Sequence, residues 1–376
     1  MITVIADDLT GAAELAGISL RYGLRTELCT GDVKDTDADV LVVSTDSRSM
    51  NKEAAVKITI DVLKQVLPLK PALVYKKIDS VLRGYVLDEL EVQMQLMGKD
   101  SAFILPANPS LGRTIRNGEY FIDGKRITDT GFASDPEFPV QSSGIRSMLK
   151  DDSVAVCKTG DTLSIGIVVG EAENEKEVQV WADKIGDDRV LAGAGDFYTA
   201  LLRRQHKECQ KEDKQVQLPF LYVCGTAYDQ SVKRVNEISG KLDAVMYINK
   251  QMILSPSSDN SAWFEQCQEK LQRCQKTVIA FEKSQIPAGS PASELRDTMA
   301  KTVKQVVERN TVRELFIEGG STATAILDEL DIKHLKPVNE LKRGVVRMRA
   351  GDLYITVKPG SYELPDEIKD LFELKT

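Results

Sequence analysis

The chain has 376 residues, 42% of them apolar and 28% charged, and a formal net charge of −8 at pH 7. This length usually divides into two domains, and the acidic balance argues against nucleic acid or an anionic membrane surface as a partner. No apolar run approaches the length of a membrane span and no secretory signal precedes Asp7 and Asp8, so we expect a cytoplasmic protein that does not enter membranes.

In the first half of the chain, short β-rich runs alternate with helical patterns, which predicts a parallel sheet with helices on both faces. The predicted strands are 3–6, 26–29, 40–44, 72–76 and 102–105, and the predicted helices are 12–22, 52–66 and 87–97. Segment 118–130 breaks this rhythm and predicts a β-hairpin with Asp123 and Gly124 at its turn. A strand at 163–169 and a helix at 175–185 follow.

A highly charged stretch predicts a linker at 207–217 between a first domain, 1–206, and a second domain, 218–376. The alternation then restarts, with strands at 220–224, 244–247, 277–281 and 314–317, helices at 231–239, 263–274, 292–308 and 321–330, and a β-rich tail at 344–357. We therefore predict an α/β fold of two lobes. Each lobe has a mainly parallel sheet flanked by helices, and the ligands bind in a cleft between the lobes.

Four predicted strands of the first lobe are followed directly by polar residues. Asp7 and Asp8 follow the first strand, and since one such side chain suffices to cap the next helix, the second is unexplained. The other three strands lead into the segments STDSR (44–48), YKKIDSVLRG (75–84) and PANPSLGRT (106–114). Because ligands of open α/β sheets bind outside the carboxyl ends of the strands, these four segments predict a binding site.

The side chains of these segments suit a small, anionic ligand that is rich in hydroxyl groups. Arg48 and Arg83 can each bind a carboxylate through two hydrogen bonds, and Lys77 supplies a further positive charge. Sugar hydroxyls can exchange hydrogen bonds with the acidic and hydroxyl side chains Asp7, Asp8, Asp46, Asp79 and Ser80. Any one of these motifs is equally explained as a cap or a turn, but four together favour a site. With only two histidines, the chain is poorly supplied for zinc or His-dependent catalysis, which leaves phosphoryl transfer well suited.

Glycine-rich joints between strand and helix recur in the second lobe. In ELFIEGGSTATAI (314–326), Gly319 and Gly320 allow close backbone approach, and the amides that begin the helix favour an anion such as phosphate. A tight strand-to-helix turn is the alternative, and the Walker pattern GxxxxGK[ST] does not occur in the sequence. Gly225 and Thr226 form a similar joint. Lys358, before a Pro-Gly turn, could neutralise a phosphate or be a solvated strand end.

One segment suggests a different kinase. LAGAGDFYTALL (191–202) matches the GAGD helix start of ribokinase-like sugar kinases, in which the glycines form an anion hole and the aspartate, here Asp196, is the base. That motif is expected late in a single larger domain, whereas here it lies in mid-chain, just before the predicted linker. We therefore interpret it as a further glycine-rich joint, with Asp196 as a helix N-cap, and keep the ribokinase-like kinase as an alternative.

Together, the motifs resemble those of the four-carbon acid sugar kinase family. IADDLTGA, STDSR, YKKIDSVLRG, PANPSLGRT, the Gly-Thr joint, GGST and KPGSY occur in the order seen in that family, and the resemblance covers essentially the whole chain. It implies an N-terminal sugar-acid-binding domain and a C-terminal ATP-binding domain. It also implies transfer of the γ-phosphate of ATP to the terminal hydroxyl of threonate, erythronate or a 3-oxo-tetronate.

The resemblance also implies roles for particular residues. Sugar-acid contacts fall at Asp8, Arg48, Lys77, Asp79, Ser80 and Arg83, and nucleotide contacts at Thr226, Gly319, Gly320, Ser321, Thr322 and Gly360. We expect Asp8 to orient or deprotonate the acceptor hydroxyl, with Asp79 and Asp196 as rivals. Mg²⁺ is expected to bridge phosphate oxygens with few protein ligands, which the sequence does not identify.

Three points are left open at this stage. Ala13 and Glu14 stand where many members of that family have another acidic residue, so the identity of the sugar acid is open. A homodimer is open as well. A sensor that binds a sugar acid without catalysis is a further alternative, although it does not need the glycine-rich joints of the second lobe.

Overall fold

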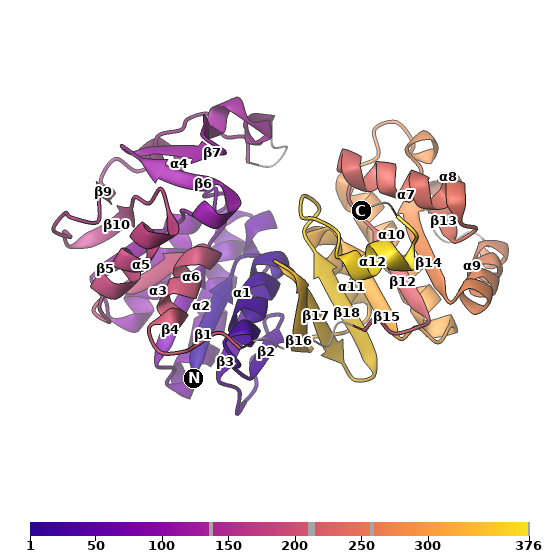
Figure 1. The fold of residues 1–376 in the computed structure, drawn as a ribbon, viewed down its shortest axis with the longest axis horizontal. Helices are drawn as coiled ribbons and strands as arrows, with labels where there is room; N and C mark the ends of the chain where they lie inside the picture. Colours follow the sequence, from indigo (N-terminus) through magenta and orange to yellow (C-terminus); the bar gives the residue numbers. More distant parts are fainter. Residues whose placement is uncertain (135–137, 210–214, 256–258, 375–376) are drawn as a thin grey trace. The chain divides into compact units, whose positions relative to one another are not determined.

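The computed structural model describes residues 1–134, 138–209, 215–255 and 259–374. The chain divides into two compact units, Met1–Gln210 and Lys211–Thr376 (Figure 1). Residues 210–214 of the predicted linker lie outside the described residues, so the linker and the cleft between the lobes stay predictions. Within the described ranges, no helix combines the length and the apolar character needed to span a bilayer.

The first unit is built on a parallel sheet with the strand order β2-β3-β1-β4-β11-β5-β10-β9. Every residue of β3 and β5 is buried, as expected for strands covered on both faces. The strands are β1 (Ile2–Ala6), β2 (Thr26–Cys29), β3 (Val40–Ser44), β4 (Leu73–Lys77), β5 (Ser101–Leu105), β9 (Ala155–Cys157), β10 (Gly166–Gly170) and β11 (Val190–Gly193).

Helices pack around this sheet (Figure 1). They are α1 (Leu9–Arg21), α2 (Lys52–Val66), α3 (Val86–Met97), α4 (Ile145–Leu149), α5 (Glu175–Lys184) and α6 (Gly195–Arg203). Right-handed crossovers place α1, α5 and α6 on one face and α2 and α3 on the other, in agreement with the α1–α6, α5–α6 and α2–α3 contacts. The loop after β1 thus leads to one face, and the loops after its neighbours β3 and β4 lead to the other. In such sheets this divergence marks the ligand site.

A small antiparallel sheet, β6-β7-β8, follows β5. Its strands are β6 (Arg113–Arg116), β7 (Glu119–Ile122) and β8 (Lys125–Arg126). The predicted hairpin is confirmed, because Asp123 and Gly124 form the β7–β8 turn with left-handed φ angles of 49° and 77°. The sequence did not predict β6, β9 or β11, and it started the strand that became β10 three residues too early.

The second unit has the sheet order β13-β14-β12-β15-β18-β17-β16. The strands from β13 to β18 in this order are parallel, and β17 and β16 are antiparallel, so each unit has the mainly parallel sheet that was predicted. The strands are β12 (Phe220–Cys224), β13 (Val245–Ile248), β14 (Lys276–Phe281), β15 (Glu314–Glu318), β16 (His334–Lys342), β17 (Val345–Ala350) and β18 (Leu353–Lys358).

Six α-helices accompany these strands in the described part of the unit: α7 (Asp229–Lys241), α8 (Lys250–Leu254), α9 (Ser261–Cys274), α10 (Ala292–Arg309), α11 (Gly320–Glu329) and α12 (Asp366–Leu371). The core contains Phe220, Tyr222 and Phe316 from the sheet together with Phe372 after α12, all fully buried. The carboxyl ends of β12, β15 and β18 lie side by side in the sheet, which brings the glycine-rich loops that follow them together.

Candidate functional site

Asp7, Asp8 and Arg48 form an ion-pair cluster at the carboxyl ends of β1 and β3. Arg48 lies in the 3-10 turn after β3 and donates from Nε and Nη2 to the two carboxylate oxygens of Asp7, at 2.8 and 2.9 Å. Its Nη1 lies 3.2 Å from Oδ2 of Asp8. Gly84, with φ of 87°, packs against the pair, since a Cβ there would lie 3.4 Å from Cγ of Arg48. Two carboxylates therefore fix the guanidinium of Arg48.

The two neighbouring carboxyl groups, Asp7 and Asp8, differ in pKa. Burial raises the pKa of Asp7 above its ordinary value, and the attraction of Arg48 offsets this only in part. Burial acts on Asp8 too, but Arg48 and Lys77 outweigh it, so the pKa of Asp8 is lowered. The Asp8 side chain is 17% exposed against 6% for Asp7, which makes Asp8 the more accessible. Asp8 is thus an ionised, reachable acceptor for a ligand hydroxyl.

Asp8 also has a structural role, as the N-cap of α1. Its Oδ1 accepts a hydrogen bond from the backbone N–H of Gly11 at 2.9 Å, and its Oδ2 accepts one from the hydroxyl of Thr10. The helix start therefore holds the carboxylate in one orientation. Capping and ligand binding are compatible, because a carboxylate has about four acceptor positions.

Asp79 and Arg83 form a second pair in the loop after β4. Arg83 donates from Nε to Oδ2 of Asp79 at 2.7 Å and from Nη2 to Oδ1 at 3.1 Å. Burial raises the pKa of Asp79, but Arg83 and Arg48 outweigh it and hold this pKa well below its usual range. Nη1 of Arg48 lies 3.9 Å from Oδ1 of Asp79 and links the two pairs. Both arginines that were predicted to bind a ligand carboxylate are therefore already paired with a carboxylate of the protein.

Lys77 and Asp46 complete the predicted set. Lys77 is buried beside α1, where its Nζ donates to the carbonyl oxygen of Ile78 at 2.9 Å and lies 3.7 Å from Oε2 of Glu14. Asp46 is half-buried and begins the turn that carries Arg48, with a left-handed φ of 49°. Glu14, one of the two residues at which the sequence differs from many family members, thus contacts Lys77, a predicted ligand-binding residue.

Asp196 lies at the same edge of the sheet, because β11 pairs with β4 and β5. It is not the N-cap of α6, which is Ala194, so that interpretation is wrong. Its carboxylate accepts hydrogen bonds from the backbone N–H and the hydroxyl of Ser110 at 2.9 and 2.5 Å, and its own N–H donates to Oδ1 of Asn108 at 3.1 Å. Asp196 therefore fastens the PANPSLGRT loop to the start of α6.

Sequence reasoning did not select Arg113 as a site residue, although it noted the loop that ends there. The guanidinium of Arg113 donates to the hydroxyl of Ser80, in the loop after β4. It also stacks near the ring of Phe132, 5.9 Å from its centroid, beside Arg83 at 5.5 Å. The small sheet thus brings a further cation to the site.

In the second unit, the loops after β12, β15 and β18 meet. The hydroxyl of Thr322 donates to the carbonyl oxygen of Gly225 at 3.2 Å, and a Cβ on Gly225 would lie 2.2 Å from that hydroxyl. A Cβ on Gly360 would lie 2.7 Å from Oγ1 of Thr226. Gly319 has φ of 114°, a backbone conformation that only glycine adopts readily. The predicted nucleotide-binding residues of the three loops are therefore assembled.

Gly320 and Ser321 form the first turn of α11, and Ser321 is exposed there. The first N–H groups of a helix have no partner within the helix, so this turn offers backbone donors next to the three loops. The arrangement suits a phosphate group, which helix N-termini bind through such donors.

Lys358 differs from both sequence interpretations. It is fully buried, and its Nζ donates to Oε1 of Glu318 at 2.7 Å and to the carbonyl oxygens of Pro359 and Gly360 at 2.9 and 3.2 Å. These bonds use the three N–H groups of the ammonium, so Lys358 is neither solvated nor directed at a phosphate in this structure. It supports the Gly360 loop from inside.

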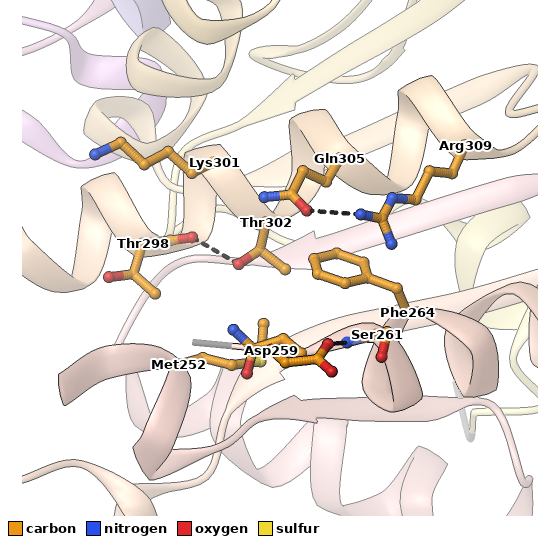
Figure 2. A pocket seen from close by; sticks show the side chains of 10 residues that line it. Met252, Asp259, Ser261, Phe264, Thr298, Lys301, Thr302, Gln305 and Arg309 are labelled. Carbon is orange, nitrogen blue, oxygen red and sulfur yellow. Dashed lines mark hydrogen bonds between the residues drawn. The ribbon is translucent and has the colours of Figure 1, made fainter. Parts of the chain in front are cut away.

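A pocket of about 230 Å³ lies elsewhere in the second unit (Figure 2). Side chains of α9 and α10 line it, with Met252 of α8. Figure 2 shows Arg309 beside Gln305, to which it donates at 3.3 Å, and its guanidinium lies 4.3 Å from the ring centroid of Phe264. No predicted nucleotide-binding residue lines this pocket, so the pocket does not mark the predicted nucleotide site.

Two family models match the chain, one for a sugar-binding N-terminal domain over residues 2–199 and one for a nucleotide-binding C-terminal domain over residues 198–362. These are the two domains that the resemblance to the four-carbon acid sugar kinases implies. The chain belongs to this family. The prediction made from the motifs is confirmed, and the ribokinase-like alternative is not supported.

Individual relatives are similar over different lengths. The D-threonate kinase of Salmonella typhimurium is 26% identical over 96% of this chain and 94% of its own. The 3-oxo-tetronate kinase of Brucella melitensis is 32% identical over 40% of this chain and 36% of its own. A crystal structure of a Haemophilus influenzae protein matches with a TM-score of 0.77 and 17% identity over 99% of both chains, which supports the two-unit fold.

Proposed function

We propose that this protein is an ATP-dependent kinase that phosphorylates the terminal hydroxyl of a four-carbon sugar acid, namely threonate, erythronate or a 3-oxo-tetronate. The observation that carries the proposal is the ion-pair cluster of the first unit. There the ionised, accessible Asp8 lies where the loops after β1 and its neighbours diverge, within the part of the chain that matches the sugar-binding model. Kinase relatives named for different tetronates support the substrate class and leave the particular acid open.

Asp8 is the group that orients the acceptor hydroxyl. Its lowered pKa makes it a weak base, but phosphoryl transfer demands little deprotonation before the transition state, so a positioned carboxylate that takes up the proton late suffices. Its rivals are less accessible, since the Asp79 side chain is 8% exposed against 17% for Asp8, and Asp196 is buried. As the acceptor oxygen bonds to the γ-phosphorus, the bond to the bridging oxygen breaks, ADP leaves, and the hydroxyl proton passes to Asp8.

The remaining predicted residues frame the sugar acid. Arg48 and Arg83 are held rigidly by their carboxylate partners, so they present a fixed surface to the substrate rather than flexible side chains. Lys77 adds positive charge near Asp8. The other predicted residues, Asp7, Asp46 and Ser80, lie in the loops after β1, β3 and β4.

The second unit suits ATP. The backbone donors of residues 319–322, Thr226 and Gly360 would hold the phosphates, and the three closely packed glycine loops fit that group. Within the described ranges no group of three or more His, Cys, Asp and Glu side chains is placed to hold a metal ion. Mg²⁺ would accompany ATP and neutralise charge on the phosphates, with few ligands from the protein, as is usual for this ion.

The test is ADP release from Mg·ATP over a panel of D- and L-threonate, D- and L-erythronate and 3-oxo-tetronates. Release that depends on one acceptor would establish the kinase and identify its substrate. If ATP binds but no acid in the panel causes ADP release, other hydroxy acids should be tested. If ATP does not bind, the alternative of a sugar-acid sensor is favoured. A homodimer and a cytoplasmic location stay predictions.

A further inference from the structure

The cations around Asp8 differ in what they already bind. Arg48 is paired with Asp7 and Asp8, Arg83 with Asp79, and Lys77 lies 3.7 Å from Glu14. Each of these charges is balanced by a carboxylate of the protein. A sugar acid brings one more carboxylate, and burying it without a cation of its own is costly.

Arg113 is the exception. The hydroxyl of Ser80 is the hydrogen-bond partner of its guanidinium, and among the described residues no carboxylate lies within 4.0 Å of it, although at longer range its charge helps Arg83 and Arg48 to lower the pKa of Asp79. A guanidinium has five N–H groups, so most of its donors remain unused. Arg113 is half-buried, and the ring of Phe132 stacks near both Arg113 and Arg83. A partly buried guanidinium with unused donors is suited to an anion.

The small sheet supplies a second, independent sign of a ligand. Ile115 pairs with Tyr120 across β6 and β7, and the alternation of side chains puts Arg113 and Tyr120 on the same face. Tyr120 is fully buried, and its hydroxyl has no hydrogen-bond partner in the described part of the chain. Such orphaned hydroxyls are rare in folded proteins. Burial raises the pKa of Tyr120, and of the two charges that also act on this hydroxyl, Arg113 lowers that pKa and Asp79 raises it.

We propose that Arg113, presented by β6, is the residue that binds the substrate carboxylate, with the hydroxyls of Ser80 and Tyr120 as its neighbours. This inference rests on the proposed function, because it assigns the carboxylate end of the sugar acid to the small sheet. A carboxylate offers two oxygens to the unused donors of the guanidinium, the geometry that arginine binds best. The Arg48 and Arg83 pairs then act as the frame, and Asp8 faces the opposite, hydroxyl end of the acid.

The test compares three variants with the parent by calorimetric titration of the sugar acid without nucleotide. Arg113→Gln should weaken binding by about 100-fold, the loss expected for a bidentate charged contact. Arg113→Lys should lose about 10-fold, because an ammonium keeps the charge but not the fork of donors. The matched control is Arg116→Gln, on the same strand but exposed, where the ion pair with Glu173 is 3.8 Å long, and it should bind as the parent does.

Tyr120→Phe provides a readout that a purely structural role would not move. It removes a hydroxyl without a partner, so the melting temperature of the free protein should stay the same or rise, while acid affinity falls several-fold. Parent-like affinity in Arg113→Gln would overturn the inference, as would an equal loss in Arg113→Gln and Arg116→Gln. If the parent binds an acid but releases no ADP, the kinase proposal fails alone. If the parent binds none, both fail.

Discussion

Replacing Asp8 by asparagine separates its two roles in the structure. As N-cap of α1, Asp8 accepts from the N–H of Gly11 at 2.9 Å, and asparagine caps about as well as aspartate. As a charged acceptor, Asp8 meets Arg48 at 3.2 Å, and the amide of asparagine cannot carry that charge. The substitution should therefore spare the helix and remove the acceptor of the substrate proton.

The stability loss should be small compared with the loss in rate. Arg48 keeps both hydrogen bonds to Asp7, so the variant loses about one charged hydrogen bond, or about 1.5–3 kcal/mol of unfolding free energy. Typical domains have about 5–15 kcal/mol, so the fold should persist. Loss of a positioned proton acceptor should lower kcat by about 10²–10⁴-fold. The corresponding rise in the barrier is about 3–5 kcal/mol.

The assay is steady-state ADP release on the acid found in the panel, with the circular dichroism spectrum and the urea midpoint as folding controls. The KM for ATP should not change, because the predicted nucleotide contacts lie on other loops. The matched variant is Asp196→Asn, which removes an equal charge at the same sheet edge. A kcat above about a tenth of the parent value in Asp8→Asn would refute the role of Asp8. If kcat fell sharply in Asp196→Asn and not in Asp8→Asn, Asp196 would be the base, as in the ribokinase-like alternative.

Three further outcomes are expected. Gly225→Ala should abolish ATP binding in calorimetry while sugar-acid binding persists, since its Cβ would lie 2.2 Å from a threonine hydroxyl of the neighbouring loop. Below pH 4 the unfolding free energy should fall as protons bind the unfolded chain first, because Arg83 and Arg48 outweigh burial and lower the pKa of Asp79. In Asp79→Asn the unfolding free energy should depend less steeply on pH. Measured by urea unfolding between pH 4 and 2, its slope should be smaller than that of the parent by about 1.4 kcal/mol per pH unit. Lys358→Met should cost about 3 kcal/mol of unfolding free energy in urea, because the buried Glu318 keeps only the longer ion pair with Arg234, at 3.4 Å. If this variant kept its stability but bound ATP more weakly, Lys358 would instead contact the phosphates of ATP.

The long, periodic elements were predictable from the sequence, and the elements whose place depends on distant partners were not. The β7–β8 turn was identified because Asp-Gly fits a left-handed turn. Val190–Gly193 gave no such signal, because its small residues become a strand only through pairing with β4 and β5. In β16, Pro337 argues against a strand, and the structure accommodates it where the register shifts, between Pro337 and Asn339.

The sequence predicted which residues form the candidate site better than it predicted which of them bind one another. Strand-end positions and motif order identified Asp8, Arg48 and Arg83, and the structure assembles them with their neighbours. That Arg48 binds Asp7, 41 residues away in sequence, is decided by the sheet and has no local signature. Lys358 was misjudged because lysines are almost never fully buried unless paired, and its partner Glu318 was read only as part of a strand.

These pairings explain why the substrate carboxylate should be bound by the arginine of the fourth strand-end segment, PANPSLGRT, and not by Arg48 or Arg83. A guanidinium held by a carboxylate through two hydrogen bonds is rigid, which favours precise positioning, but its charge is already balanced. The Arg48 and Arg83 pairs can therefore fix the shape of the site while adding little attraction for an anion. That attraction must come from a cation that is not held in a close ion pair, and Arg113 is such a cation in the described part of the first unit. Its place on a separate small sheet lets the carboxylate contact change without disturbing the frame around Asp8.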